Sequence, residues 1–286
     1  MIYNICGIKI NSKNEKIFED SYLYHSNDYN INLILTNLNQ QHYPNVEKKH
    51  EIDAIEILEN NFSFYFVMNG ILLVLIDSSN SVWDVKISRN ISVNAIREIV
   101  IKKVIPLYCY YTNCALPFHA TAIVKNNTIF SFSGYSTAGK STLAASFIIN
   151  ENYMLFSDDI LNLFPVNGNI WAYRGYSKLK LRKESIEEFG VNTISCNNYS
   201  EPYQIKDIIV ISNKPSDKIT IKRIENPKCC ILQNLFCGKF CKYNADFFDL
   251  MFEIENNITF WEFCYPRRYE DLNKVKKFLE EKMVKK

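Results

Sequence analysis

The chain has 286 residues, of which 47% are hydrophobic and 22% are charged, and its formal net charge is +2. This composition is that of an ordinary globular protein, long enough for one large domain or two modest ones. The nearly balanced charge excludes the strongly basic composition of an electrostatic nucleic-acid binder, so we expect no nucleic-acid partner.

The distribution of apolar residues argues against membrane insertion and secretion. The longest apolar runs, such as GILLVLI at residues 70–76, are too short to cross a bilayer. The first ten residues, MIYNICGIKI, lack the basic and apolar regions of a signal peptide. We therefore expect a cytoplasmic protein without a membrane partner, whose nine cysteines are reduced thiols.

Residues 1–90 are rich in β-branched and aromatic residues separated by polar turns, and they predict a β-rich domain of unknown role. Asn69-Gly70 is a strong signal for a hairpin turn. The histidines His25, His42 and His50 are isolated, and surface positions explain them best. The strands of this region also offer an open sheet edge with which an extended peptide can pair.

Residues 91–286 mix predicted strands and helices, which is typical of an α/β domain. Ser92 predicts the N-cap of a helix that Pro106 closes. The stretch CALPFHATAIV then predicts an apolar strand that carries His119. At the end of the chain, apolar residues at helical spacing within residues 272–283 predict a solvated last helix.

Four cysteines cluster within residues 229–241, and a zinc site is one interpretation of them. Their spacing fits no standard ligand pattern. An Asn-Pro pair just before the cluster predicts the start of a helix on which Cys230, Cys237 and Cys241 share one face. We therefore expect core residues here instead of a metal site.

The stretch SFSGYSTAGKSTLAASF at residues 131–147 contains the pattern G-x-x-x-x-G-K-[ST], whose backbone N–H groups cradle nucleotide phosphates. Lys140 can reach the β- and γ-phosphates, and the Ser141 hydroxyl can ligate Mg²⁺. A Gly/Ser turn before a helix is the alternative. A predicted hairpin before the loop and a helix at residues 142–149 after it favour the phosphate loop. Its predicted binding residues are Gly134, Tyr135, Ser136, Thr137, Ala138, Gly139, Lys140, Ser141 and Thr142.

The stretch YMLFSDDI predicts a short strand that ends in Asp158-Asp159 and directly follows the loop helix. Phosphoryl transfer requires a carboxylate that holds Mg²⁺ and a group that orients the nucleophile. Adjacent side chains on an extended chain point to opposite sides, so one carboxylate can face the metal and the other the acceptor. We assign Ser141 and Asp159 to the metal and Asp158 to the acceptor proton; a turn cap is the alternative for the pair.

The chain resembles the C-terminal catalytic domain of HPr serine kinase/phosphorylase in three stretches, FHATAIV, FSFSGYSTAGKSTLA and YMLFSDDI. The nucleotide site of that family is similar to that of the ATP-using phosphoenolpyruvate carboxykinases. The resemblance covers about residues 90–286 and weakens after Arg182. It implies ATP and Mg²⁺ as cofactors and places His119 beside the site, where it would orient the acid or the γ-phosphate. Without the resemblance, a satisfied core histidine is the alternative for His119.

The chain also departs from authentic HPr kinases. Thr142 follows the loop serine where that family usually has Glu, and no Arg-Gly-Leu-Gly-like stretch follows. Instead, GYSKLKLR and FCYPRRYEDL look like HPr-kinase-like proteins of ribosomal peptide gene clusters, which include kinases of lasso-peptide precursors. This likeness implies a serine kinase with a peptide or small-protein acceptor, and it leaves the oligomeric state open.

Three further interpretations stay open at this stage, namely a small-molecule kinase, HPr kinase/phosphorylase itself and a non-catalytic ATP-binding module. The second aspartate favours an enzyme, because a pure binder has no need for it. Arg267 or Arg268 can neutralise the charge that develops on the phosphoryl group. A surface pair of arginines is the alternative.

Overall fold

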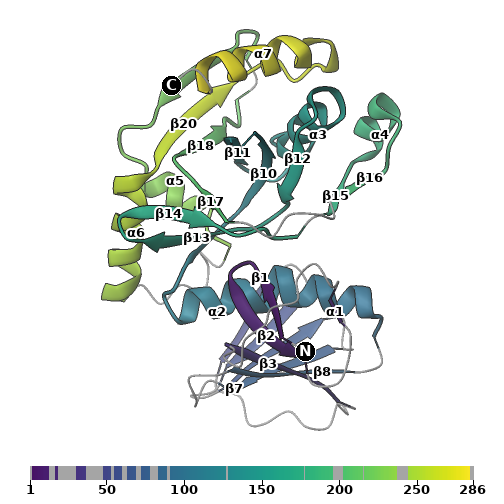
Figure 1. Ribbon diagram of the computed structural model, residues 1–286, viewed down its shortest axis with the longest axis vertical. Helices are drawn as coiled ribbons and strands as arrows, with labels where there is room; N and C mark the ends of the chain where they lie inside the picture. The colour runs from purple at the N-terminus through teal and green to yellow at the C-terminus, as the bar shows by residue number, and fades with distance from the viewer. Residues whose placement is uncertain are drawn as a thin grey trace. The chain divides into compact units, whose positions relative to one another are not determined.

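The structure is a computed structural model that describes residues 2–12, 17–18, 30–36, 48–52, 55–59, 63–68, 72–77, 83–88, 91–126, 128–176, 178–195, 202–214, 216–236 and 244–283. It divides into two compact units, Met1–Lys103 and Val104–Lys286 (Figure 1). The expected mixed α/β fold is confirmed, with a β-rich first unit and a second unit that combines sheets and helices. The domain boundary between residues 90 and 91 stays a prediction.

The first unit contains an eight-stranded sheet with the order β1-β2-β3-β8-β7-β6-β5-β4. β2, β3 and β8 run parallel to one another, and the remaining neighbours pair antiparallel. Asn69-Gly70 lies outside the described residues, as do His25 and His42, but β6 and β7 on either side of the turn form the expected antiparallel pair. The strands are β1 (Ile2–Ile5), β2 (Ile8–Ser12), β3 (Ile31–Thr36), β4 (Lys48–Ile52), β5 (Ile55–Glu59), β6 (Ser63–Met68), β7 (Leu72–Asp77) and β8 (Trp83–Ser88).

The helix that follows is longer than the sequence predicts. Ser92 is its N-cap, as expected, and its Oγ accepts a backbone N–H of the first turn at 3.3 Å. The prediction that Pro106 closes the helix is wrong, because α1 (Val93–Ile99) continues through the π-helical η2 (Val100–Val104) into α2 (Ile105–Tyr111). Proline lacks an N–H and crowds the preceding turn, and the wider π-helical turn just before it accommodates both effects.

The second unit is built on a six-stranded sheet with the order β12-β10-β11-β18-β20-β19. β11, β18 and β20 are parallel, and the other pairs are antiparallel. The predicted hairpin is confirmed, since β10 and β11 pair from Lys125↔Thr128 to Ala120↔Ser133. The strands are β10 (Ala120–Lys125), β11 (Thr128–Ser133), β12 (Met154–Ser157), β18 (Asp207–Ile211), β19 (Thr220–Arg223) and β20 (Thr259–Cys264).

Two smaller sheets accompany it, one with the order β17-β14-β13-β9 and one formed by β15 and β16. The predicted strand CALPFHATAIV is therefore divided, because β9 and β10 belong to different sheets and His119 lies at the junction between them. The strands are β9 (Leu116–Phe118), β13 (Leu161–Val166), β14 (Asn169–Ala172), β15 (Lys178–Lys180), β16 (Thr193–Ser195) and β17 (Tyr203–Gln204).

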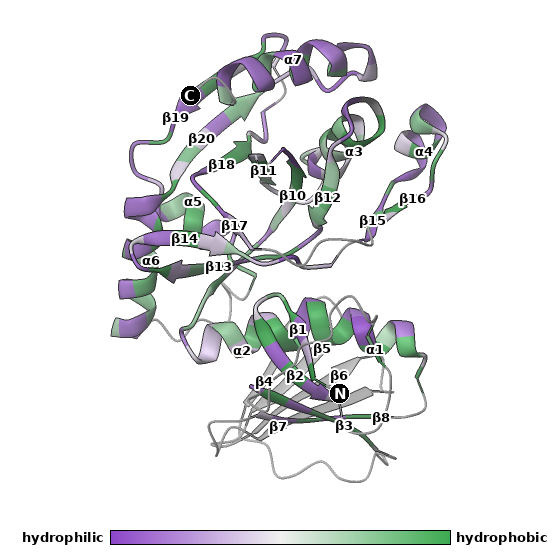
Figure 2. Ribbon diagram, viewed as in Figure 1, coloured by the Kyte–Doolittle hydropathy of each residue, from purple (hydrophilic) through white to green (hydrophobic). Residues whose placement is uncertain are grey.

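Five α-helices and a 3₁₀ turn complete the described part of the second unit after the phosphate loop. α3 packs against β10 and β11, and α7 packs against α3 (Figure 1). α7 carries both hydrophilic and hydrophobic residues (Figure 2), and its buried Leu272, Val275 and Leu279 confirm the predicted helix with apolar residues at helical spacing. The elements are α3 (Lys140–Glu151), α4 (Lys183–Phe189), α5 (Lys228–Gln233), α6 (Ala245–Asn257), η3 (Tyr269–Asp271) and α7 (Leu272–Met283).

The cysteine cluster is only partly described. Cys229 and Cys230 lie on α5, which begins after Pro227 without a side-chain cap and ends at Gln233. The prediction of one helix that carries Cys230, Cys237 and Cys241 is wrong, because the chain leaves the helix at Asn234 and Leu235 forms an isolated β-bridge with Phe118. Cys237 and Cys241 themselves lie outside the described residues. Within the part of the chain that the structure describes, no helix is long and apolar enough to cross a membrane.

The core between the six-stranded sheet and α3 is aromatic. Phe147 of α3 is fully buried and its ring lies 5.7 Å from that of Phe130, 6.0 Å from that of Phe132 and 5.0 Å from that of Tyr153. Each of these partners comes from β11 or from the residue just before β12. Phe147 therefore fixes the helix that begins at the phosphate loop against the strand that leads into it.

We expect Phe147→Ala to lower the free energy of unfolding by about 3 to 5 kcal/mol, because it removes a buried ring and leaves a cavity. Phe252→Ala is the control, since Phe252 on α6 is 44% exposed and its loss should change the free energy by less than about 0.5 kcal/mol. Urea unfolding followed by circular dichroism measures both. Equal losses for the two variants would contradict this account of the core.

Candidate functional site

The loop between β11 and α3 approaches its neighbours so closely that two of its positions require glycine. Gly134 has φ +138°, and a Cβ there would lie 2.8 Å from the carbonyl oxygen of Ile211. Gly139 has φ +99°, and a Cβ there would lie 2.7 Å from the Tyr265 hydroxyl oxygen. A side chain at either position would combine backbone strain with a steric clash. The backbone of the loop is therefore held against β18 on one side and against Tyr265 on the other.

The first turn of α3 is built to receive an anion. Gly139 is its N-cap and supplies no side-chain acceptor, so no side chain caps this end of the helix. The first N–H groups of a helix have no partner within the helix, and the helix dipole adds partial positive charge at the same end. The backbone N–H groups of Lys140, Ser141 and Thr142 therefore form the start of an anion cradle.

The Lys140 side chain folds back onto the loop. Its Nζ donates to the carbonyl oxygens of Gly134 at 2.8 Å and Tyr135 at 3.1 Å, and the residue is only 7% exposed. Burial lowers the pKa of the Lys140 ammonium below its ordinary value, whereas the nearby carboxylates of Asp159 and Asp158 act in the opposite direction. Lys140 thus orders the loop, and its charge lies at the cradle.

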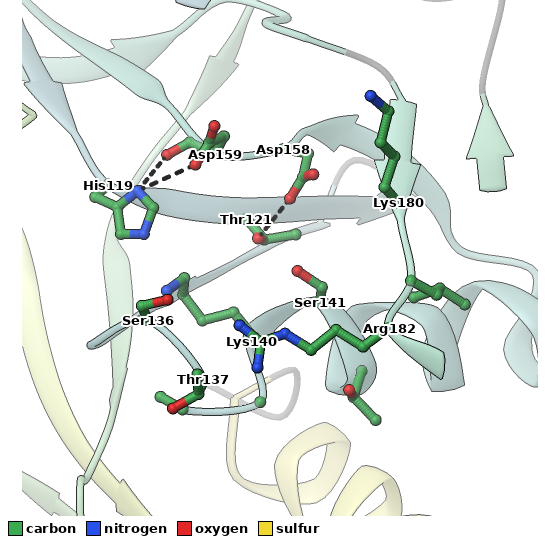
Figure 3. A pocket seen from close by; sticks show the side chains of 14 residues that line it. His119, Thr121, Ser136, Thr137, Lys140, Ser141, Asp158, Asp159, Lys180 and Arg182 are labelled. Carbon is green, nitrogen blue, oxygen red and sulfur yellow. Dashed lines mark hydrogen bonds and ion pairs between the residues drawn. The ribbon is translucent and has the colours of Figure 1, made fainter. Parts of the chain in front are cut away.

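The two aspartates follow β12 directly, as predicted, but not in extended conformation. β12 ends at Ser157, and Asp159 has the left-handed φ of +77°. The prediction that strand alternation points the two carboxylates to opposite sides is therefore wrong. Instead, a tight turn separates the carboxylates: Asp158 Oδ1 accepts the Thr121 hydroxyl at 3.0 Å, while Asp159 Oδ1 lies 3.4 Å from His119 Nδ1 (Figure 3).

His119 is held in place through its backbone. Its N–H donates to the Asn234 carbonyl oxygen at 2.6 Å, and its own carbonyl oxygen accepts the Ser133 hydroxyl at 2.8 Å. Ser133 Oγ also lies 2.8 Å from Asn234 Oδ1, and both residues are buried. The His119 side chain is 34% exposed and its Nδ1 lies 2.8 Å from the Asp159 carbonyl oxygen, so it is not a core histidine.

One pocket of about 260 Å³ joins these parts, with the loop on one wall and the two aspartates and His119 on the other (Figure 3). Most of the predicted site residues line it. Gly134 and Tyr135 take part through the carbonyl oxygens that bind Lys140, and the Tyr135 side chain is 53% exposed. The lining residues are His119, Thr121, Ser136, Thr137, Ala138, Gly139, Lys140, Ser141, Thr142, Asp158, Asp159, Lys180, Leu181 and Arg182.

The structure does not place the predicted arginines in this pocket. Arg267 donates to the Ser212 carbonyl oxygen at 2.6 Å, and Arg268 lies 3.3 Å from Asp271, and neither lines the cavity. Lys180 and Arg182 line it instead, and sequence reasoning did not assign them to the site. The available signal was the alternation KLKLR at residues 178–182, which puts the cations on one side of an extended segment.

No protein-family model matches this sequence, and no curated protein matches it. Among solved structures, the HPr(Ser) kinase/phosphatase from Coxiella burnetii is similar over 59% of this chain and 97% of its own, with 13% sequence identity and a TM-score of 0.34. A likeness at this level carries no functional argument.

The close approach at Gly139 leads to a specific prediction. Gly139→Ala should lower the free energy of unfolding by about 1 to 3 kcal/mol because of backbone strain, and it should weaken ATP binding at least tenfold because the loop must shift. Gly168→Ala is the matched control, since Gly168 also has a positive φ, of +71°, but has no neighbour within 4 Å. Thermal unfolding with and without ATP distinguishes the two variants. ATP binding at parental affinity by Gly139→Ala would contradict the loop assignment.

Proposed function

We propose that this chain is an ATP- and Mg²⁺-dependent serine kinase that transfers the γ-phosphoryl group to a hydroxyl of a peptide or small protein. One observation carries the proposal: a single pocket has an uncapped helix start with Lys140 on one wall and Asp158, Asp159 and His119 on the other. A phosphate cradle alone only binds a nucleotide, whereas carboxylates opposite it supply what phosphoryl transfer requires.

The residues fit ATP and Mg²⁺. The first N–H groups of α3 and the Lys140 ammonium would hold the β- and γ-phosphates. Ser141 and Asp159 would hold Mg²⁺, which would neutralise charge on the phosphate oxygens. Mg²⁺ in kinases takes one or two protein ligands, and phosphates and waters complete its shell. Ser141 and Asp159 both line the pocket and can supply two such ligands.

Asp158 is the residue that we assign to the acceptor hydroxyl. As the hydroxyl oxygen bonds to the γ-phosphorus, the bond from that phosphorus to the oxygen shared with the β-phosphate breaks. The hydroxyl proton passes to Asp158, and the products are a phosphoserine and ADP. A carboxylate suffices, because this reaction depends more on positioning than on a strong base. The hydrogen bond from Thr121 at 3.0 Å holds the Asp158 carboxylate for this role.

His119 and Arg182 would support this transfer in two different ways. A proton on His119 Nδ1 can donate to the Asp159 carbonyl oxygen at 2.8 Å, and this contact fixes the ring against the turn that carries both aspartates. Arg182 extends across the pocket toward Lys140 (Figure 3). In this position it is better placed than Arg267 to neutralise charge on the transferring phosphoryl group.

The two aspartates should separate by role. We expect Asp158→Asn to lower the turnover rate at least about 100-fold, because the substrate hydroxyl loses the carboxylate that takes its proton. The variant should leave Mg²⁺–ATP binding unchanged. Asp159→Asn should weaken Mg²⁺-dependent ATP binding about tenfold or more. Calorimetric titration of ATP with and without Mg²⁺ measures the difference. Asp246→Asn, an exposed position on α6, is the control. If neither pocket variant differs from this control, the pair is structural and the proposal fails.

The acceptor is tested by mass spectrometry after incubation with ATP and Mg²⁺. The two candidate acceptors are a precursor peptide encoded near this gene, with a terminal serine, and HPr. We expect one added phosphate, 80 Da, on a serine of the peptide and none on HPr. Phosphate on HPr would replace the proposal by an HPr kinase. Phosphate on neither, with ATP still bound, would favour a small-molecule acceptor or a non-catalytic module.

A further inference from the structure

Two cysteines meet at the C-terminal end of α2 (Figure 1), where the backbone brings them together. The N–H of Cys114 donates to the Cys109 carbonyl oxygen at 3.2 Å, and the N–H of Asn113 donates to the Tyr110 carbonyl oxygen at 3.2 Å. Asn113 has the left-handed φ of +51°. Two such bonds around a left-handed residue form a Schellman motif, in which the side chains at the positions of Cys109 and Cys114 commonly touch each other.

The two thiols are close enough to be joined. The Cys114 thiol forms a hydrogen bond with the Cys109 side chain. The backbone bond of 3.2 Å and standard bond lengths limit the separation of the two Cα atoms to about 7 Å. A disulfide spans Cα separations of up to about 6.8 Å, so the pair can form one with little movement of the backbone.

Exposure gives the two thiols different roles. Cys114 is exposed, whereas Cys109 is fully buried. The hydrogen bond with Cys109 lowers the pKa of the Cys114 thiol below its ordinary value, and the Thr112 side chain acts in the same direction against the effect of burial. The thiolate is the form that reacts with oxidants. Cys114 is therefore placed to react first, and Cys109 is placed to react with the product on Cys114.

A second pair of cysteines in the described part of the chain is arranged differently. Cys229 and Cys230 are adjacent on α5, where consecutive side chains do not face each other. Cys229 is exposed, as Cys114 is. Burial raises the pKa of the Cys230 thiol to about 12, so this neighbour stays protonated. Cys229 is thus an internal comparison for an exposed cysteine without a facing thiol on the next residue.

We infer that Cys109 and Cys114 form a redox-modification site, which a hydroperoxide converts reversibly to a disulfide. In the first step the Cys114 sulfur bonds to a peroxide oxygen and the O–O bond breaks, which yields a sulfenic acid and, from hydrogen peroxide, one water. In the second step the Cys109 sulfur bonds to the Cys114 sulfur and the S–O bond breaks. The departing oxygen takes the Cys109 thiol proton and leaves as a second water, so the two thiols lose two electrons to the peroxide.

Cys109 makes this oxidation reversible. A sulfenic acid without a neighbouring thiol can be oxidised further to a sulfinic acid, which thiols do not reduce. Because Cys109 already contacts Cys114, the disulfide forms in its place, and an external dithiol restores both cysteines by exchange. The inference goes beyond the proposed kinase function and does not depend on it, because neither cysteine lines the pocket.

The test is peptide mapping of the full chain. Trypsin cuts after Lys103 and Lys125, and the peptide of residues 104–125 contains Cys109, Cys114 and no other cysteine. The protein is treated with hydrogen peroxide, remaining thiols are blocked with N-ethylmaleimide, and the digest is analysed by mass spectrometry. We expect this peptide to lose two hydrogen atoms, to carry no blocking group and to revert with dithiothreitol. The change should be at least about tenfold faster than oxidation of Cys229.

Two variants separate the roles of the cysteines. Cys109→Ser keeps a hydrogen-bond donor beside Cys114 but removes the second thiol, so Cys114 should accumulate a sulfenic acid that dimedone labels. Cys114→Ser should leave Cys109 unoxidised at the same peroxide concentration. Cys229→Ser is the control and should form the disulfide at the parental rate.

The parent protein decides the inference even if a variant does not fold. Two blocked thiols in the peptide of residues 104–125, under conditions that oxidise Cys229, would overturn it. A disulfide between Cys114 and a different cysteine would overturn it as well. Dimedone labelling of Cys114 that is equal in the parent and in folded Cys109→Ser would also contradict it, because Cys109 would then have no part in the second step.

Discussion

The site depends on how closely the backbone of the phosphate loop approaches β18 and Tyr265. A single methyl group at Gly134 or Gly139 would lie within 2.8 Å of a neighbouring oxygen atom. Because both glycines adopt positive φ, the chain turns sharply enough to place the start of α3 directly after β11. The buried ring of Phe147 then fixes α3 against the strand. The cradle is therefore held by the core itself.

The opposite wall is coupled to the same strand. Ser133, the last residue of β11, bonds to the His119 backbone and to Asn234, so the end of the loop strand also fixes His119. β12 pairs with β10, and Asp158 follows it to accept the hydroxyl of Thr121. Both walls thus derive from one hairpin and its immediate neighbours. Because both walls share this hairpin, the cradle and the carboxylates that face it arise within about forty residues.

The features that were predictable from the sequence are those that local rules determine. The residue pattern of the loop at residues 134–141 itself indicates phosphate binding. The periodicity of apolar residues predicts the hairpin before the loop and the helix after it. Other features depend on tertiary context. Pro106 continues a helix through a π-helical turn, Asp159 adopts a left-handed turn, and His119 lies between two sheets. Arg182 was missed because the alternation KLKLR puts the cations on one side of the segment but does not show that this side borders the pocket.

The central claim is that Lys140 and the loop bind the phosphates that are transferred, and ATP turnover by Lys140→Ala tests it most directly. The Lys140 ammonium also bonds two loop carbonyl oxygens, so a modest loss of thermal stability is expected in the absence of nucleotide. With Mg²⁺ present, the account predicts that the variant remains folded and loses at least about 100-fold in turnover. A folded Lys140→Ala variant that turns over ATP at the parental rate would contradict it.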